Sequence, residues 1–264
     1  MEAILRFSIA AGIFGIMITW EYRRPRRRLQ FGRERRWPVN LGLAVFNMVL
    51  MRLTIGSLAY LSALDAFESG FGLLNRLSGP RWMSIAATLL VLDFAIYCQH
   101  ILMHKWPPLW RLHQVHHTDI DFDATTAVRF HPLEIMLSML YKVGCIYLIG
   151  ADPAAVIAFE IVLNGAATFN HGNVNIPPAV DRLLRLAVIT PDMHRIHHSV
   201  EPAETDSNYG FSISLWDRLC GTYTAEPSRP HTSMSIGLKP FRRIEELSFV
   251  NLLVLPFSAL KRRR

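Results

Sequence analysis

The chain is 264 residues long, which is enough for one large domain or two small ones. Apolar residues make up 51% of it and charged residues only 19%, below the roughly 25% that is typical of soluble domains. With a net charge of +7 and three widely separated cysteines, the composition argues against an ordinary soluble domain and against a disulfide framework. It indicates a membrane protein.

The first apolar stretch, residues 3–20, is followed by a strongly basic segment. Because the arginines follow the apolar run and no small-residue cleavage site appears, we expect a retained membrane span instead of a signal peptide. From Arg23 to Arg36 there are eight arginines against one glutamate. Such segments can bind nucleic acid. This one and the terminal KRRR adjoin long apolar stretches, so we expect no nucleic acid partner and instead anchors on an anionic cytoplasmic membrane surface.

Three further apolar regions follow along the chain. Residues 39–64 predict a second span, and residues 83–104 predict a third after a polar loop. Residues 133–169 are apolar except at GADP, residues 150–153, which predicts a short helical hairpin. The expected fold is therefore all-α, a polytopic membrane protein with about four transmembrane segments and a cytoplasmic helical cap.

The last third of the chain is less apolar. Residues 170–245 are mixed and polar, and we expect them to face water. The final apolar run, residues 247–260, is short and interrupted by Pro256, so an interfacial amphipathic segment fits it better than a span.

The positive-inside rule gives the expected orientation. Placing the loop of residues 23–36 in the cytoplasm sends the first span inward and the second outward. The third span then ends at His100 and His104 on the cytoplasmic side, and the hairpin goes out and back. Every clustered histidine would thus lie on one face of the membrane.

Ten of the eleven histidines fall into groups, and eight of these lie in motifs. His100 and His104 form HxxxH, whose rings share one helix face. Two copies of HxxHH follow. In each copy the first and last rings can serve one ion, while the middle ring diverges by about 100° toward a neighbouring ion. The eight motif imidazoles are enough for two metals, and two looser histidines could complete the shell. These candidate ligands are His100, His104, His113, His116, His117, His194, His197 and His198, with His131 and His171 as the looser pair.

The remaining histidine and several polar residues have more than one reading. We expect His231, between Pro230 and Thr232, at the surface. Asp93 lies inside an apolar span, two turns before His100, where it could accept a hydrogen bond from a ligand's distal N–H or pair with another helix. Asp206, Asn208 and Asp217 could be further acceptors around the metals or turn formers.

Together the motifs resemble a known family. HxxxH, HxxHH, a following HP and a final HxxHH, joined by NYG and WDRLxGTY, resemble the fatty acid hydroxylase superfamily, also called the sterol desaturase family. The stretch MHRIHHS…DSNYGFSISLWDRLCGTY is most similar to its alkylglycerol monooxygenase and bacterial sterol-desaturase-like branch. The resemblance covers roughly residues 83–224, and it implies a catalytic region there, flanked by residues 1–82 with the first spans and by a C-terminal tail, residues 225–264.

The resemblance implies a membrane-embedded non-haem diiron enzyme that uses O2 and two electrons to hydroxylate or desaturate a lipid. It implies two iron ions held by the histidines named above, with zinc able to replace iron in purified material. Some family members have a further HxxxH ending at the position of His171, but the earlier residue here is Ala167. Either His131 substitutes, or one iron has an open or water-filled position.

The chain contains no GxGxxG and no haem-attachment CxxCH motif, so electrons would come from a separate protein such as a ferredoxin or a cytochrome b5-like donor. Sterol, fatty acid, ether lipid, hopanoid and carotenoid substrates stay open, as does the oligomeric state. The bacterial branch implies the inner membrane.

Two other functions fit the same histidines. A zinc-dependent membrane hydrolase would use them, but such enzymes usually place a glutamate inside the motif, as in HExxH, and these motifs have none. A metal transporter would place its site near the bilayer midplane, whereas these histidines are expected at one interface.

Overall fold

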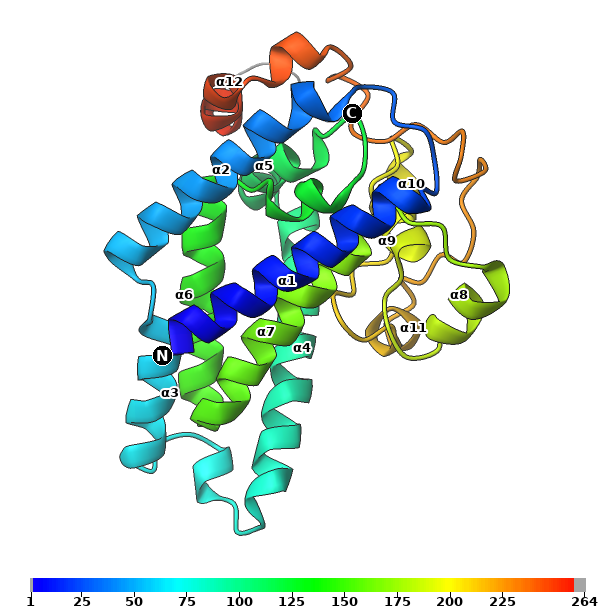
Figure 1. Ribbon diagram of the computed structural model, residues 1–264. Coiled ribbons are helices and arrows are strands. Elements are labelled where there is room, and N and C mark those ends of the chain that lie inside the picture. The colour runs from blue at the N-terminus through cyan, green and yellow to red at the C-terminus, as the bar shows by residue number, and fades with distance from the viewer. Residues whose placement is uncertain (1, 259–264) are drawn as a thin grey trace.

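The structure of the protein is a computed structural model that describes residues 2–258, and these residues form an all-helical fold, as expected (Figure 1). The only strand-like pairings among them are three isolated bridges. The α-helices of the described part are α1 (Glu2–Arg23), α2 (Arg33–Thr54), α3 (Leu58–Glu68), α4 (Arg81–Lys105), α5 (Pro107–His117), α6 (Pro132–Ile149), α7 (Pro153–Asn170), α8 (Pro178–Leu184), α9 (Pro191–His197), α10 (Pro202–Thr205), α11 (Leu215–Leu219) and α12 (Phe249–Val254).

Four helical stretches in the described part are long and apolar enough to cross a membrane, so the chain is an integral membrane protein. They are Arg33–Glu68, Arg81–Lys105, Pro132–Ile149 and Pro153–Asn170. Helices α3, α4, α6 and α7 pack side by side as a bundle, and α1 crosses it against α7 (Figure 1). The predicted third span and the hairpin are confirmed. The first apolar stretch forms α1, and its crossing of the membrane stays a prediction.

The hairpin turns where the sequence places GADP. Gly150 adopts the left-handed conformation, with φ of 68°, and a Cβ there would lie 2.6 Å from the Phe71 carbonyl oxygen, so only glycine fits. The Asp152 carboxylate caps α7 by accepting from Ala154 N–H, and it also accepts from the Arg81 guanidinium.

The expected second span is not one straight helix. It breaks between α2 and α3, and the two helices run in different directions (Figure 1). At the break the Thr54 hydroxyl donates to the Leu50 carbonyl, and the backbone around Gly56 passes close to α2, where a Cβ would lie 3.1 Å from the Arg52 Cα. Serine, threonine and glycine compete with helical hydrogen bonding or relax it, which explains the bend.

The basic loop between α1 and α2 is only partly available to a membrane surface. Arg26 pairs with Asp192, and Arg27 donates to the carbonyl oxygens of His231 and Met234. Arg36 is fully enclosed, with bonds of 2.7 Å to Asp119 and to Asp123. Sequence reading missed this role because the acidic partners lie at least 83 residues away. These arginines therefore tie the loop to the cap, the part of the chain outside the bundle at residues 106–131 and 171–248. Neighbours such as Arg23, Arg24, Arg28 and Arg35 stay exposed.

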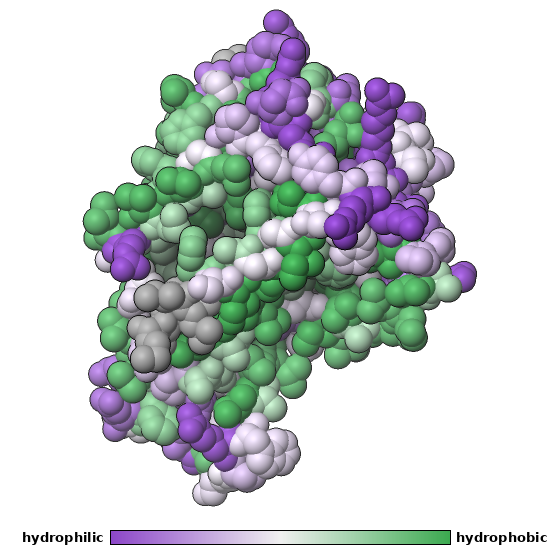
Figure 2. All heavy atoms as spheres, in the orientation of Figure 1, coloured by the Kyte–Doolittle hydropathy of each residue, from purple (hydrophilic) through white to green (hydrophobic). Residues whose placement is uncertain are grey.

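The expectation that residues 170–245 simply face water is wrong in two ways. Much of this segment is buried around the histidines, and its outer surface carries exposed apolar side chains on α8 and α11. These include Val180, Leu183, Leu215 and Leu219. Figure 2 shows hydrophobic spheres over this part of the surface, beside the membrane bundle.

Helix α12 is amphipathic, as expected for the end of the chain. Leu252, together with Leu255 in the 3-10 turn that follows α12, is buried in a core cluster with Leu43 and Trp110, while Val250 and Val254 are exposed. An interfacial position for this segment stays a prediction. The terminal KRRR, residues 261–264, lies outside the described residues.

Candidate metal centre

Nine buried histidines converge where the bundle meets the cap. Helix α4 contributes two of them from its last two turns, and α5 contributes three. His171 caps the C-terminus of α7, and α9 with its C-terminal cap supplies the other three. The short α5 and α9 each begin with a proline in the first turn, which pre-forms the helix that aligns the imidazoles.

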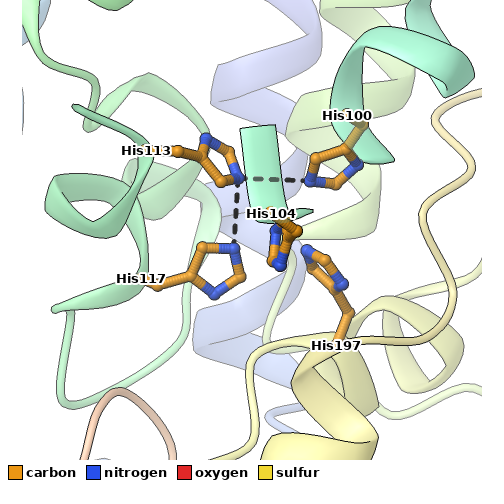
Figure 3. A group of neighbouring side chains, drawn as sticks. All are labelled: His100, His104, His113, His117 and His197. Carbon is orange, nitrogen blue, oxygen red and sulfur yellow. Dashed lines mark hydrogen bonds between the residues drawn. The ribbon is translucent and has the colours of Figure 1, made fainter. Parts of the chain in front are cut away.

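The first group brings together five rings from three helices (Figure 3). Their ligand nitrogens lie within 4.8 Å of one another, and the Nε2 atom of His113 lies 3.2 Å from the Nε2 atoms of both His100 and His117. In Figure 3 the rings point toward a common centre from opposite sides. The members are His100, His104, His113, His117 and His197.

The second group contains four rings, with His171 at its middle. The Nε2 atom of His171 lies 3.1 Å from those of His116 and His194, and 3.2 Å from that of His198. The ligand nitrogens of all four residues again lie within 4.8 Å of one another.

The two HxxHH motifs divide between the groups as their spacing predicts. His113 and His117 belong to the first group, and His116 between them belongs to the second. In the other motif His194 and His198 belong to the second group, and His197 belongs to the first. Each motif therefore contributes to both groups, which places the groups next to each other.

The spacing of the nitrogens suits metal ions. Neighbouring nitrogens bound to one ion at about 2.1 Å are separated by roughly 3.0–3.4 Å, which matches the 3.1–3.2 Å measured here. Burial, followed by the neighbouring imidazoles, lowers the pKa of His116, His117, His194 and His198 well below the usual value. Burial also lowers the pKa of His171, to about 4. The rings are thus held neutral at pH 7, the form that binds metals.

Hydrogen bonds on the far side of several rings fix which nitrogen faces the centre. The Nδ1 atoms of His100, His171 and His197 each lie 2.7 Å from a backbone carbonyl oxygen, those of Tyr209, Ala167 and Ser207. A carbonyl oxygen only accepts, so each of these Nδ1 atoms carries the proton and its Nε2 presents a lone pair inward.

Glu134 is a functional candidate that sequence reasoning missed. It is buried in the first turn of α6, and its Oε1 accepts from His113 Nδ1 at 2.5 Å. The local sequence RFHPLE shows only a glutamate near the start of a helix, which is a common position for capping. Contact with His113 depends on how α6 packs against α5, which the sequence does not reveal.

Replacing Glu134 with glutamine is expected to weaken metal binding at the first group by about 10- to 100-fold, because His113 would lose the carboxylate that orients it and raises its basicity. Glu204→Gln is the control, since the Glu204 carboxylate accepts from Ser228 N–H in the cap. Competition with a chromogenic chelator measures the affinity. Equal affinity in the two variants would show that the Glu134 contact does not tune the site.

The four polar residues expected around the metals differ in which groups they contact. Asp206 Oδ1 lies 3.4 Å from His104 Nδ1, so it reaches a histidine. Asp217 accepts from the Tyr209 and Gly210 N–H groups and so holds the backbone whose carbonyl bonds His100. Asn208, with φ of 50°, donates from its side-chain amide to the carbonyl oxygens of Met193 in α9 and of Thr224, and so joins these two segments of the cap.

Asp93 serves helix packing. Its Oδ2 accepts from the Trp216 indole at 2.8 Å, while the Nδ1 atom of His100 bonds the Tyr209 carbonyl. The reading of Asp93 as a polar partner for another helix is therefore the one that these contacts support.

Two histidines lie apart from both groups. His131 caps α6 by accepting from Leu133 N–H at Nδ1, and its Nε2 lies 3.1 Å from the Leu253 carbonyl oxygen. With both nitrogens in these contacts, His131 belongs to neither group. His231 is buried beside Asp192, so the expectation of a surface position is wrong. Burial lowers the pKa of His231 to about 4.

A cavity of about 170 Å³ adjoins the first group. His100, His113 and Glu134 form its polar end, and apolar side chains such as Met103, Phe130 and Phe211 form most of the rest. For comparison, an apolar cavity of about 150 Å³ holds a benzene-sized molecule. The cavity suits part of an apolar chain.

Fold and site together define a helical membrane protein with two adjacent histidine groups that could each hold a metal ion. The chain belongs to the fatty acid hydroxylase family, whose model matches residues 85–222. Both histidine groups lie within the matched region.

Several curated proteins are similar to the chain. It is 29% identical over 184 residues to the ornithine lipid hydroxylase OlsE of Rhizobium tropici, covering 70% of this chain and 53% of the relative. It is 32% identical over 145 residues to the alkylglycerol monooxygenase of Xenopus tropicalis, covering 54% and 31%. A cholesterol 25-hydroxylase-like protein of Danio rerio is 28% identical over 139 residues, covering 52% and 54%. The chain thus spans between about a third and a half of the length of these relatives. No solved structure matches it significantly.

Proposed function

We propose that this protein is a membrane-bound non-haem diiron oxygenase that hydroxylates or desaturates a lipid with O2 and externally supplied electrons. The observation that carries the proposal is the pair of adjacent, buried, all-histidine groups. Within each group, neighbouring Nε2 atoms lie 3.1–3.2 Å apart. Membership in the fatty acid hydroxylase family and the names of the relatives support it. The proposed ligands are the nine histidines of the two groups, and His131 is left out.

Two iron ions would supply the O2 chemistry that no side chain can perform, the cleavage of an unactivated C–H bond. The chain contributes positioning. The carbonyl oxygens of Ala167, Ser207 and Tyr209 hold their histidines in the tautomer that binds metal. The apolar wall beside His100 and His113 would exclude water and hold a hydrocarbon segment against the centre.

Electrons would come from a separate protein, such as a ferredoxin or a cytochrome b5-like donor. The exposed arginines of the basic loop lie near the cap and could attract an acidic donor. We also propose that the metal centre lies on the cytoplasmic side of the membrane, the bacterial inner membrane, because this orientation keeps the basic loop inside.

The substrate class is proposed as an amphiphilic lipid. The relatives' names point to ornithine lipids, alkylglycerols and fatty acids, which share a long hydrocarbon chain and a polar end. The cavity beside the first group fits a segment of such a chain.

Comparing lipid extracts of cells that do and do not produce the protein tests the activity. Mass spectrometry is expected to show one lipid species that gains the mass of an oxygen atom or loses that of two hydrogens, and only when O2 is supplied. His113→Ala protein is the matched control. Cleaved lipids in place of oxidised ones would instead favour a zinc hydrolase, and unchanged lipids with metal uptake would favour a transporter.

A further inference from the structure

A second cavity, of about 760 Å³, lies in the part of the molecule formed by the membrane helices. Its wall comes from α1, the break between α2 and α3, α4, α6 and α7. Figure 2 shows a hollow between α1 and α2 whose surroundings are mostly hydrophobic. Unlike the smaller cavity, this one is lined by four charged side chains: Arg6, Arg52, Lys142 and Glu160.

The charges in this cavity do not balance. Arg6 and Lys142 both pair with the Glu160 carboxylate, and Lys142 and Glu160 are buried. Arg52 is exposed on the cavity wall and has no carboxylate partner among the residues that the structure describes. Three positive side chains thus face one negative side chain. An uncompensated charge within a membrane is costly and marks functional sites. An anion bound in the cavity would balance the excess positive charge of its lining.

The two cavities lie next to each other. They share five lining residues, one from α4 and two each from α6 and α7: Ile96, Ile135, Ser138, Leu163 and Asn164. A molecule with an anionic end at Arg52 could therefore extend an apolar chain along this wall to His100 and His113.

We propose that the larger cavity binds the acidic headgroup, a phosphate or carboxylate, of the lipid substrate and so sets which carbon of its chain reaches the histidines. Arg52 supplies the unpaired charge, and the fork of its guanidinium suits a bidentate oxyanion. The Arg6–Glu160–Lys142 cluster holds α1, α6 and α7 together around the headgroup. This inference rests on the proposed function, which makes the histidines the point that the hydrocarbon chain of the lipid must reach. Binding of the headgroup itself does not depend on metal.

Binding can be measured by native mass spectrometry of the purified protein in neutral detergent, without reductant. The probes are phosphatidic acid, a fatty acid, and diacylglycerol with the same chains as the phosphatidic acid. We expect both acidic lipids to be retained and diacylglycerol to be retained at least about tenfold less. Arg52→Gln should remove most of this preference and Arg52→Lys should keep part of it. Arg76→Gln changes an exposed arginine that lines neither cavity and should leave the preference unchanged.

Equal retention of the three lipids, or a preference untouched by Arg52→Gln, would overturn the inference. So would inorganic phosphate at millimolar concentration that displaces phosphatidic acid completely, since this would indicate a site for a free anion. A different result would contradict the proposed oxygenase function. An acidic lipid that binds through Arg52 but is never oxidised by the iron-loaded, reduced protein would leave the headgroup site standing and contradict the oxygenase.

Discussion

Protein in which His171 is replaced by alanine is expected to retain one metal ion per chain in place of two. The His171 Nε2 atom lies within 3.2 Å of those of His116, His194 and His198, so its loss opens the middle of the second group. Removing only a residue that orients a ligand costs about 10- to 100-fold in affinity or activity. Removing the ligand should therefore lower lipid oxidation by more than about 100-fold. Elemental analysis and product formation are measured on the same preparation.

The matched control is His131→Asn, which changes another buried histidine of the family motif. Asparagine is a good helix N-cap, so it should replace the bond from Leu133 N–H to the ring and preserve α6. This variant is expected to keep both metal ions and most of the activity. Loss of a metal ion in His131→Asn, with full occupancy in His171→Ala, would reverse our assignment.

Replacing Arg36 with methionine is expected to destabilise the protein by about 3–5 kcal/mol, the usual cost of removing one partner from a buried ion pair. Asp119 and Asp123 would be left buried without the cation that bonds both. Burial raises the pKa of Asp119, but the Arg36 and Arg129 charges more than offset this effect and hold it well below its usual range. Asp119 is therefore ionised in the folded protein and depends on these cations.

Thermal unfolding in detergent, followed by tryptophan fluorescence, measures the effect. Arg35→Met is the control, because Arg35 is the neighbouring residue on the same helix and is exposed. We expect a large drop in the unfolding temperature for Arg36→Met and almost none for Arg35→Met. Similar drops in both variants would show that the ion pairs of Arg36 with Asp119 and Asp123 add little to stability.

Local spacing made much of the metal site predictable. In an HxxHH helix the geometry alone separates the middle ring from the outer two, and the structure divides His116 from His113 and His117 accordingly. Hydropathy and the proline and glycine signals likewise predicted α4 and the α6–α7 hairpin. These features depend on residues within a few turns of one another.

What the sequence did not reveal depends on contacts between distant segments. Glu134 meets His113, and Arg36 meets Asp119, only after helices far apart in the chain have packed. The acceptors for His100 and His197 are backbone carbonyl oxygens, which carry no side-chain signature. The misreadings of His231 and of the basic loop have the same origin, since burial by remote segments decides both.

The most direct test of the account is the metal content and magnetic state of the purified wild-type protein, produced in iron-supplemented cells without added zinc. We predict two iron ions per chain whose Mössbauer spectra show a magnetically coupled pair, as expected from histidine groups that share both HxxHH motifs. A single uncoupled iron, or a zinc form that is fully active without iron, would contradict the central claim.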